Sequence, residues 1–104
     1  MSEVRGGSPE RIGSLVENLL RSRGLAEGVE RAAVFPEWTE LVGPQIGQVA
    51  TPVGFDRSTL FVEVRSSAWL MELQMMERRI LAQLNARRRR GKFERIVFRL
   101  ASDG

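Results

Sequence analysis

Residues 78–95 contain eight basic side chains and a single acidic one, Glu94, which leaves a local excess of seven positive charges. The basic residues are Arg78, Arg79, Arg87, Arg88, Arg89, Arg90, Lys92 and Arg95. Such a cluster binds phosphate backbones by releasing their condensed counterions, and arginines at a helix end can follow an irregular single strand. Positive charges also complement the negative end of a helix dipole, but four consecutive arginines exceed what that requires. We therefore predict that these eight residues bind nucleic acid.

Arginine supplies every basic side chain of the sequence except Lys92. The planar guanidinium can bind phosphate through two hydrogen bonds, which would favour arginine over lysine. The codon usage of a GC-rich genome would also favour arginine. Two phenylalanines, Phe61 and Phe93, could stack on bases beside the basic run. Both are also apolar enough to pack in the core or on the hairpin, and we expect packing to be their main role.

A second surface is predicted from methionine spacing on the helix that begins near Trp69. At 100° per residue, Met71 and Met75 lie opposite the helix face that Trp69 occupies. Exposed methionines are adaptable contact residues, so Met71, Met75 and the neighbouring Arg78 form a candidate partner-binding site. The alternative is that the first helix of the chain covers the two methionines.

The residue types needed for most catalytic mechanisms are missing from the sequence. It has no histidine, cysteine or tyrosine, and its one lysine lies in the basic run. General-base and nucleophilic catalysis therefore lack their usual groups, and no phosphate-binding P-loop is present. Acid pairs such as Glu27 with Glu30 fall on helical surfaces and would make only a weak metal site. We predict a protein that is not an enzyme and that uses no metal or cofactor.

The elements around these residues follow from the apolar pattern. Residues 60–65 alternate as a strand with one buried face, and the period then changes to that of a helix capped by Ser66 or Ser67. The apolar stripe of this helix consists of Trp69, Leu73, Met76, Ile80 and Leu84. We expect Trp69 to close the core between the strand hairpin and the helix. Glu77 interrupts the stripe and needs a polar partner.

The remaining segments give an α+β domain in the order α-α-β-β-α-β. A first helix is expected from Ser8-Pro9 to a left-handed cap at Gly24, and a second over residues 26–42, kinked near Val34 or Phe35 by Pro36. Gly43-Pro44 should end that helix. A strand follows over residues 49–55, with Pro52 indicating an edge position or a bulge. Residues 56–58 form the hairpin turn, and residues 96–100 form the closing strand.

Length and composition indicate one domain. The chain has 104 residues, of which 42% are hydrophobic, and no apolar run approaches the ~20 residues of a membrane helix. We expect a flexible N-terminus at residues 1–7, a single domain at residues 8–101 and a tail at residues 102–104. Without cysteines or an apolar leader, the expected location is the cytoplasm.

An ordered set of short segments runs from about Ile12 to Leu100. It comprises Trp38 with Val42-Gly43, Thr51-Pro52-Val53, Leu60-Phe61-Val62-Glu63-Val64, Ser67-Ala68-Trp69, Glu72-Leu73, Leu84-Asn85 and a final basic strand. This set resembles the DciA family. The sequence departs from the family pattern at Ser58-Thr59, where many members carry glycine, and at Ala50, where histidine is frequent. Many members also continue into a long flexible tail.

The resemblance implies a KH-like domain, with a three-stranded sheet and helices packed on one face. It further implies a bacterial DNA replication protein that binds the hexameric DnaB-type replicative helicase and promotes its loading onto single-stranded or forked DNA, without hydrolysing nucleotide. The GxxG loop with which standard KH domains clamp a nucleic-acid backbone is missing, which disfavours sequence-specific RNA recognition. The alternative function is a KH-like nucleic-acid-binding module with no helicase partner.

Overall fold

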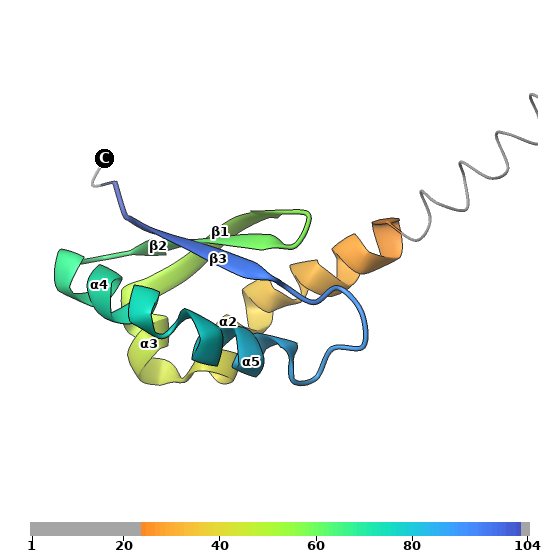
Figure 1. Ribbon diagram of the computed structural model, residues 1–104, viewed down its shortest axis with the longest axis horizontal. Coiled ribbons are helices and arrows are strands. Elements are labelled where there is room, and N and C mark those ends of the chain that lie inside the picture. The colour runs from red at the N-terminus through yellow and green to blue at the C-terminus, as the bar shows by residue number, and fades with distance from the viewer. Residues whose placement is uncertain (1–23, 103–104) are drawn as a thin grey trace, which may run out of the picture.

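The computed structural model describes residues 24–102, which form a three-stranded sheet with a layer of helices against one of its faces (Figure 1). After a helical stretch at residues 24–32, the elements are α2 (Val34–Val42), α3 (Pro44–Val49), β1 (Ala50–Asp56), β2 (Thr59–Val64), α4 (Ser67–Met75), α5 (Glu77–Asn85) and β3 (Arg95–Leu100). The predicted α+β class and KH-like arrangement are confirmed. The helix expected to begin at Ser8 lies outside the described residues.

The sheet has β2 at its centre, between β1 and β3. β1 pairs with β2 in an antiparallel hairpin, whereas β3 runs parallel to β2 with Leu60 opposite Ile96. A parallel neighbour requires a crossover connection, which α4 and α5 supply. β1 is an edge strand, and its register shifts between Pro52 and Gly54. Both the edge position and the bulge predicted from Pro52 are therefore confirmed.

The N-terminal helical segments differ from the prediction in three places. Gly24 lies within helical residues 24–32, so it does not cap a helix. The predicted kink becomes a break at Ala33, and Pro36 stands third in α2, where its missing N–H falls among the orphan donors of the first turn. Gly43, with a φ of 97°, ends α2 as predicted, but Pro44 begins the short helix α3, so that β1 starts at Ala50.

The long C-terminal helix is divided at Met76. This residue has φ −97° and ψ 8°, and its N–H donates to the carbonyl of Leu73 at 3.0 Å, which is a tighter turn than an α-helix makes. The apolar stripe continues across the break, with Leu73, Ile80 and Leu84 all buried. The break changes what each half contacts, because α4 packs on β2 and β3 and α5 packs on α2 and β3.

The core lies between the sheet and the helices. Its buried residues include Val34, Trp38, Leu60, Val62, Val64, Leu73, Ile80, Leu84, Phe93, Ile96 and Phe98. Trp38 is 3% exposed, and its Nε1 donates to the carbonyl of Ala50 at 2.9 Å. Trp69 is only partly buried, at the margin of the core. Trp69 therefore packs against the core without closing it as expected, and the buried tryptophan is Trp38.

Candidate nucleic-acid and partner interface

The loop after α5, which carries the arginine run, is closed by the side chain of Asn85. Its Nδ2 donates to the carbonyl of Phe93, and its Oδ1 accepts from the Phe93 N–H, both at 2.8 Å. The Phe93 side chain is buried and meets the ring of Phe55 edge-on, with 6.1 Å between ring centroids. Phe93 is therefore a core residue, and Asn85 fixes both ends of the loop.

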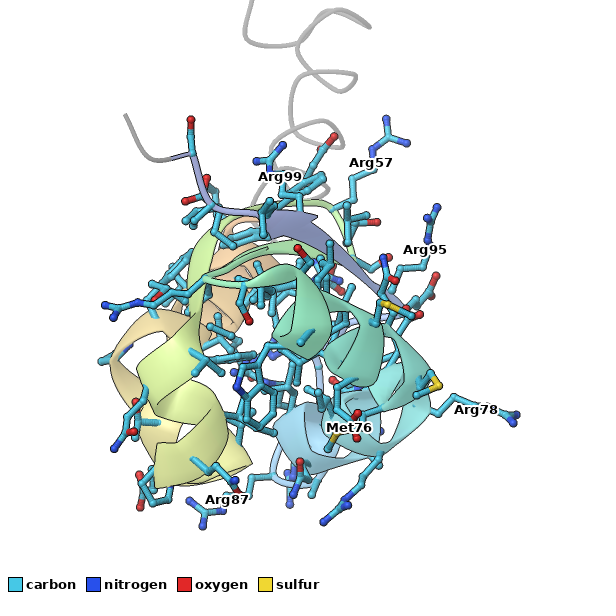
Figure 2. The ribbon with its side chains drawn as sticks, turned by 90° about the vertical axis from the view of Figure 1, so that its left-hand side faces the viewer. Arg57, Met76, Arg78, Arg87, Arg95 and Arg99 are labelled. Carbon is cyan, nitrogen blue, oxygen red and sulfur yellow. The ribbon has the colours of Figure 1, made fainter. Side chains whose placement is uncertain are left out.

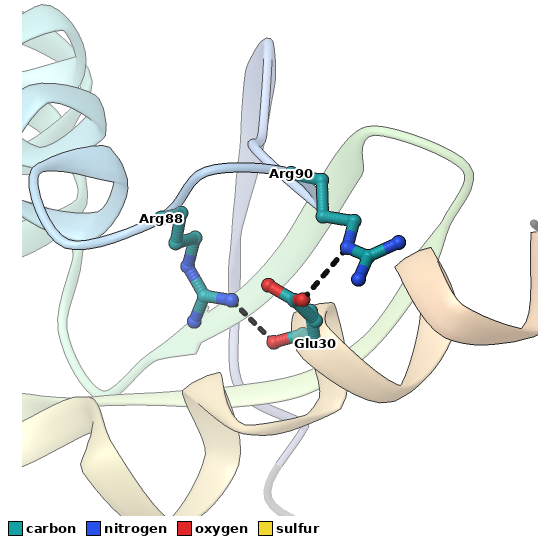
Figure 3. Close-up of polar contacts among 3 residues, drawn as sticks. All are labelled: Glu30, Arg88 and Arg90. Carbon is teal, nitrogen blue, oxygen red and sulfur yellow. Dashed lines mark hydrogen bonds and ion pairs between the residues drawn. The ribbon is translucent and has the colours of Figure 1, made fainter.

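Arg88 and Arg90 fasten this loop to the helical stretch at residues 24–32 through one residue, Glu30 (Figure 3). The Arg88 guanidinium donates to the backbone carbonyls of Glu30 and, at 3.0 Å, Leu84, and it lies 5.5 Å from the centroid of the Phe93 ring. Arg90 pairs with the Glu30 carboxylate at 3.0 Å. Half of the run of four arginines thus makes contacts within the fold.

Gly91 permits the close approach of the loop to that helix. Its φ is +69°, and a Cβ at this position would lie 2.9 Å from the carbonyl oxygen of Glu27. Arg31 adds a hydrogen bond from its Nε to the carbonyl of Lys92 at 3.3 Å. Sequence reasoning missed these contacts because their partners are about sixty positions apart, and only the opposite charges of Glu30 and the run hint at them.

The eight predicted nucleic-acid-binding residues do not share one surface. Figure 2 shows Arg78 and Arg87 projecting from different sides of the helical layer, while Arg95 lies beside the sheet. Arg79, Arg89 and Lys92 are also exposed, and Arg90 keeps 58% of its side chain exposed despite its ion pair. Arg88 is the exception, since it is half-buried. The exposed members remain candidates for phosphate contact, and Arg88 is better described as a structural residue.

Replacing Arg88 by alanine should therefore destabilise the domain by about 1–2 kcal/mol, because the carbonyls of Glu30 and Leu84 lose a charged donor. Replacing Arg87, which is exposed, should change the free energy of unfolding by less than about 0.5 kcal/mol. Urea denaturation followed by circular dichroism measures both values. Equal midpoints for the two variants would contradict the role given to Arg88.

Glu77, which interrupts the apolar stripe, has a partner in the backbone of β3. Its Oε2 accepts a hydrogen bond from the N–H of Ile96 at 2.9 Å. This bond joins the first turn of α5 to the second residue of β3. The carboxylate is thus satisfied inside the domain and helps to hold the closing strand.

The predicted partner site on α4 is exposed among the described residues. Met71 is 66% exposed and Met75 is 78% exposed, and Arg78 follows on α5 with an exposed side chain. Within residues 24–102 no element covers the two methionines, so they present apolar surface to the outside. Scattered apolar residues are common on protein surfaces, but two flexible thioethers one helical turn apart can fit an apolar partner.

A cleft of about 710 Å³ lies between the α2–α3 junction and one side of α4 and the first turn of α5. Its lining includes Gly43, Ile46, Trp69, Met76 and Arg79. Sequence reasoning missed this cleft because it placed Trp69 inside the core and did not predict α3. The lining combines apolar side chains such as Ile46 and Trp69 with the charged Arg79, and neither Met71 nor Met75 is part of it.

The described residues contain no group of three or more histidine, cysteine, aspartate or glutamate side chains arranged to hold a metal ion. None of the helices within residues 24–102 is long and apolar enough to cross a membrane.

The three-stranded sheet and its layer of helices define a small KH-like α+β domain. The family model described as "Dna[CI] antecedent, DciA" matches residues 11–98. The chain belongs to the DciA family, which is known as a family of DnaB helicase loaders.

Curated relatives support this assignment. A UPF0232 protein of Mycobacterium leprae (strain TN) is 35% identical over 75% of this chain and 41% of its own length. One of Mycolicibacterium paratuberculosis is 37% identical over 75% of this chain and 43% of its own length. A third, named as a UPF0232 protein in the recF-gyrB intergenic region of Mycolicibacterium smegmatis, is 32% identical over 75% of this chain and 40% of its own length. This chain spans about two fifths of the length of these relatives.

Proposed function

We propose that this chain acts in bacterial DNA replication by binding a DnaB-type hexameric helicase and promoting its loading onto single-stranded or forked DNA. The observation that carries the proposal is the DciA family match over residues 11–98. In this proposal the domain of residues 8–101 works in the cytoplasm as a non-catalytic adaptor, without a cofactor and without hydrolysing nucleotide. Hydrolysis is left to the helicase.

The helicase surface in this proposal is the one formed by Met71, Met75 and Arg78. The two methionines are the most exposed large apolar side chains of α4, and Arg78 adds a positive charge at its end. An apolar helix of the helicase could lie against them, in the way that amphipathic helices commonly dock. The contact needs only moderate affinity if DNA is held at a second surface, because two linked sites raise the effective concentration.

The DNA surface in this proposal is formed by the exposed members of the basic set. Arg87, Arg89 and Lys92 lie in the loop after α5, and Arg79 lies on the helix before it. Their guanidinium and ammonium groups suit a phosphate backbone without selecting a base sequence. Arg88 and Arg90 contribute mainly by holding the loop in place through Glu30.

Binding to single-stranded DNA should be salt-sensitive and independent of sequence. If about four phosphates are neutralised, a plot of log affinity against log salt should have a slope near −3, at ~0.7 counterions per contact. Replacing Arg87 and Arg89 together by alanine should reduce the slope to about −1.5, because two contacts are lost. Replacing Arg88 alone should leave the slope close to wild type. Superimposable titrations of the Arg87/Arg89 variant and the wild type would contradict phosphate binding by the loop.

The alternative function is a nucleic-acid-binding module that has no helicase partner. Size-exclusion chromatography of the chain with the replicative helicase of the same organism separates the two functions. Co-elution is expected if the chain is a helicase-binding protein. If the chain binds single-stranded DNA but elutes apart from the helicase at micromolar concentrations of both, the module function replaces our proposal.

A further inference from the structure

The face of the sheet that points away from the described helices carries an aromatic ring with a guanidinium over it. Strand alternation places Thr51, Phe61, Glu63, Val97 and Arg99 on this outer face, opposite the buried residues of the same strands. The guanidinium of Arg99 lies 5.4 Å from the centroid of the Phe61 ring. Figure 1 shows the helices of the described part on the other side of the sheet.

The Phe61 ring stands in the middle of the central strand with room beside it. Its partner on β1 is Gly54, which has no side chain, and a Cβ built at Gly54 meets nothing within 4 Å. Its partner on β3 is Val97, which is half-buried. The bulge at Pro52 and Gly54 places Val53 nearby with 46% of its surface exposed. Phe61, Val53 and Val97 therefore form an apolar platform that is open on the side of Gly54.

Four arginines lie on or next to the strands that carry this platform. Arg57 lies in the hairpin turn, Arg65 follows β2, and Arg95 and Arg99 belong to β3. Figure 2 shows Arg57, Arg95 and Arg99 on the sheet side of the domain. Three acids are close in the chain, Asp56, Glu63 and Glu94, so four positive charges against three leave an excess of one. With so small an excess, binding at this face has to come mainly from stacking.

We propose that this outer face binds the unpaired bases of single-stranded DNA, with one base stacked on Phe61 and Arg99. Every base has a π-face, so aromatic rings and guanidinium planes hold bases without reading their sequence. The arginines around the platform would meet the phosphates on either side. This inference rests on the proposed function, because it adds a base-binding surface to the phosphate contacts of the loop after α5. A duplex is excluded from this mode, since its bases are already stacked.

The test compares two variants of Phe61 that both keep an apolar side chain: leucine, which has no aromatic ring, and tryptophan, which has a larger one. Fluorescence anisotropy is measured with a thymidine oligonucleotide and with an abasic strand of the same length, using the full chain. Phe61→Leu should weaken binding to the thymidine strand about 5- to 10-fold, the effect of losing one base–aromatic stack. Its salt slope and its binding to the abasic strand should stay at wild-type values. Phe61→Trp should bind the thymidine strand at least as tightly as wild type.

A third variant separates charge from stacking. Arg99→Lys keeps the charge but loses the planar group, so it should weaken binding to the thymidine strand and leave the abasic strand unaffected. Equal melting midpoints will show that the variants are folded. If Phe61→Leu and Phe61→Trp both bind as wild type does, the outer face is not a base platform and the loop after α5 carries the DNA alone.

Two further outcomes would also overturn the inference. If Phe61→Leu converts a dimer to a monomer with unchanged DNA affinity, this face binds a second copy of the chain. If the wild-type chain itself binds no single-stranded DNA at low salt, the DNA part of the proposed function fails, and the platform fails with it.

Discussion

Replacing Trp38 by alanine should lower the free energy of unfolding by about 3–5 kcal/mol, a large fraction of the stability of a domain this size. Trp38 is 3% exposed and fills the space between α2 and the start of β1. Its Nε1 also satisfies the carbonyl of Ala50, so alanine would leave both a cavity and an unpaired buried acceptor. Guanidinium denaturation monitored by circular dichroism measures the loss.

Trp69→Ala is the matched control for this prediction. Trp69 is the other tryptophan of the chain, but it lies at the core margin and lines the cleft between α4 and the α2–α3 junction. Its replacement should cost clearly less than that of Trp38, because part of its surface is already in contact with water. A larger loss for Trp69 than for Trp38 would contradict this assignment of the two tryptophans.

Replacing Met71 and Met75 together by glutamate should abolish co-elution with the helicase while leaving the fold and DNA binding unchanged. Both side chains are mostly exposed, so carboxylates are tolerated in the free domain, but they would have to be desolvated against an apolar partner. The control is Met71→Leu with Met75→Leu, which keeps the apolar surface and should keep the complex. Full helicase binding by the glutamate variant would place the helicase surface elsewhere on the chain.

The parts of the fold that could be predicted from sequence are those set by short-range periodicity. The alternation in β2 depends on residues two positions apart, and the stripe through Leu73, Ile80 and Leu84 depends on residues one or two helical turns apart. Both patterns are found in the structure. Ser66 caps α4 as predicted, accepting from the Trp69 N–H at 3.2 Å. The break at Met76 was not predicted, because methionine normally favours a helix. The helix α3 was not predicted, because it is only six residues long.

The surfaces were harder to predict because they depend on contacts distant in sequence. Arg88 looks like its three neighbours in the sequence, yet the position of Glu30 makes it a structural residue. Trp69 is the first residue of an apolar stripe, but its exposed fraction depends on the position of α3, which lies across the cleft from it. The Phe61 and Arg99 pair requires the parallel register of β2 and β3, which the strand pattern alone does not give.

The central claim is that this chain helps a DnaB-type helicase to engage DNA, and unwinding of a forked substrate tests it most directly. The helicase of the same organism is held at a concentration where it unwinds slowly alone, and the chain is added in increasing amounts with ATP present. We predict that the initial rate of strand separation rises and then saturates with the chain, and that the chain alone releases no phosphate from ATP. An unwinding rate that stays at the helicase-only value across the whole titration would contradict the claim.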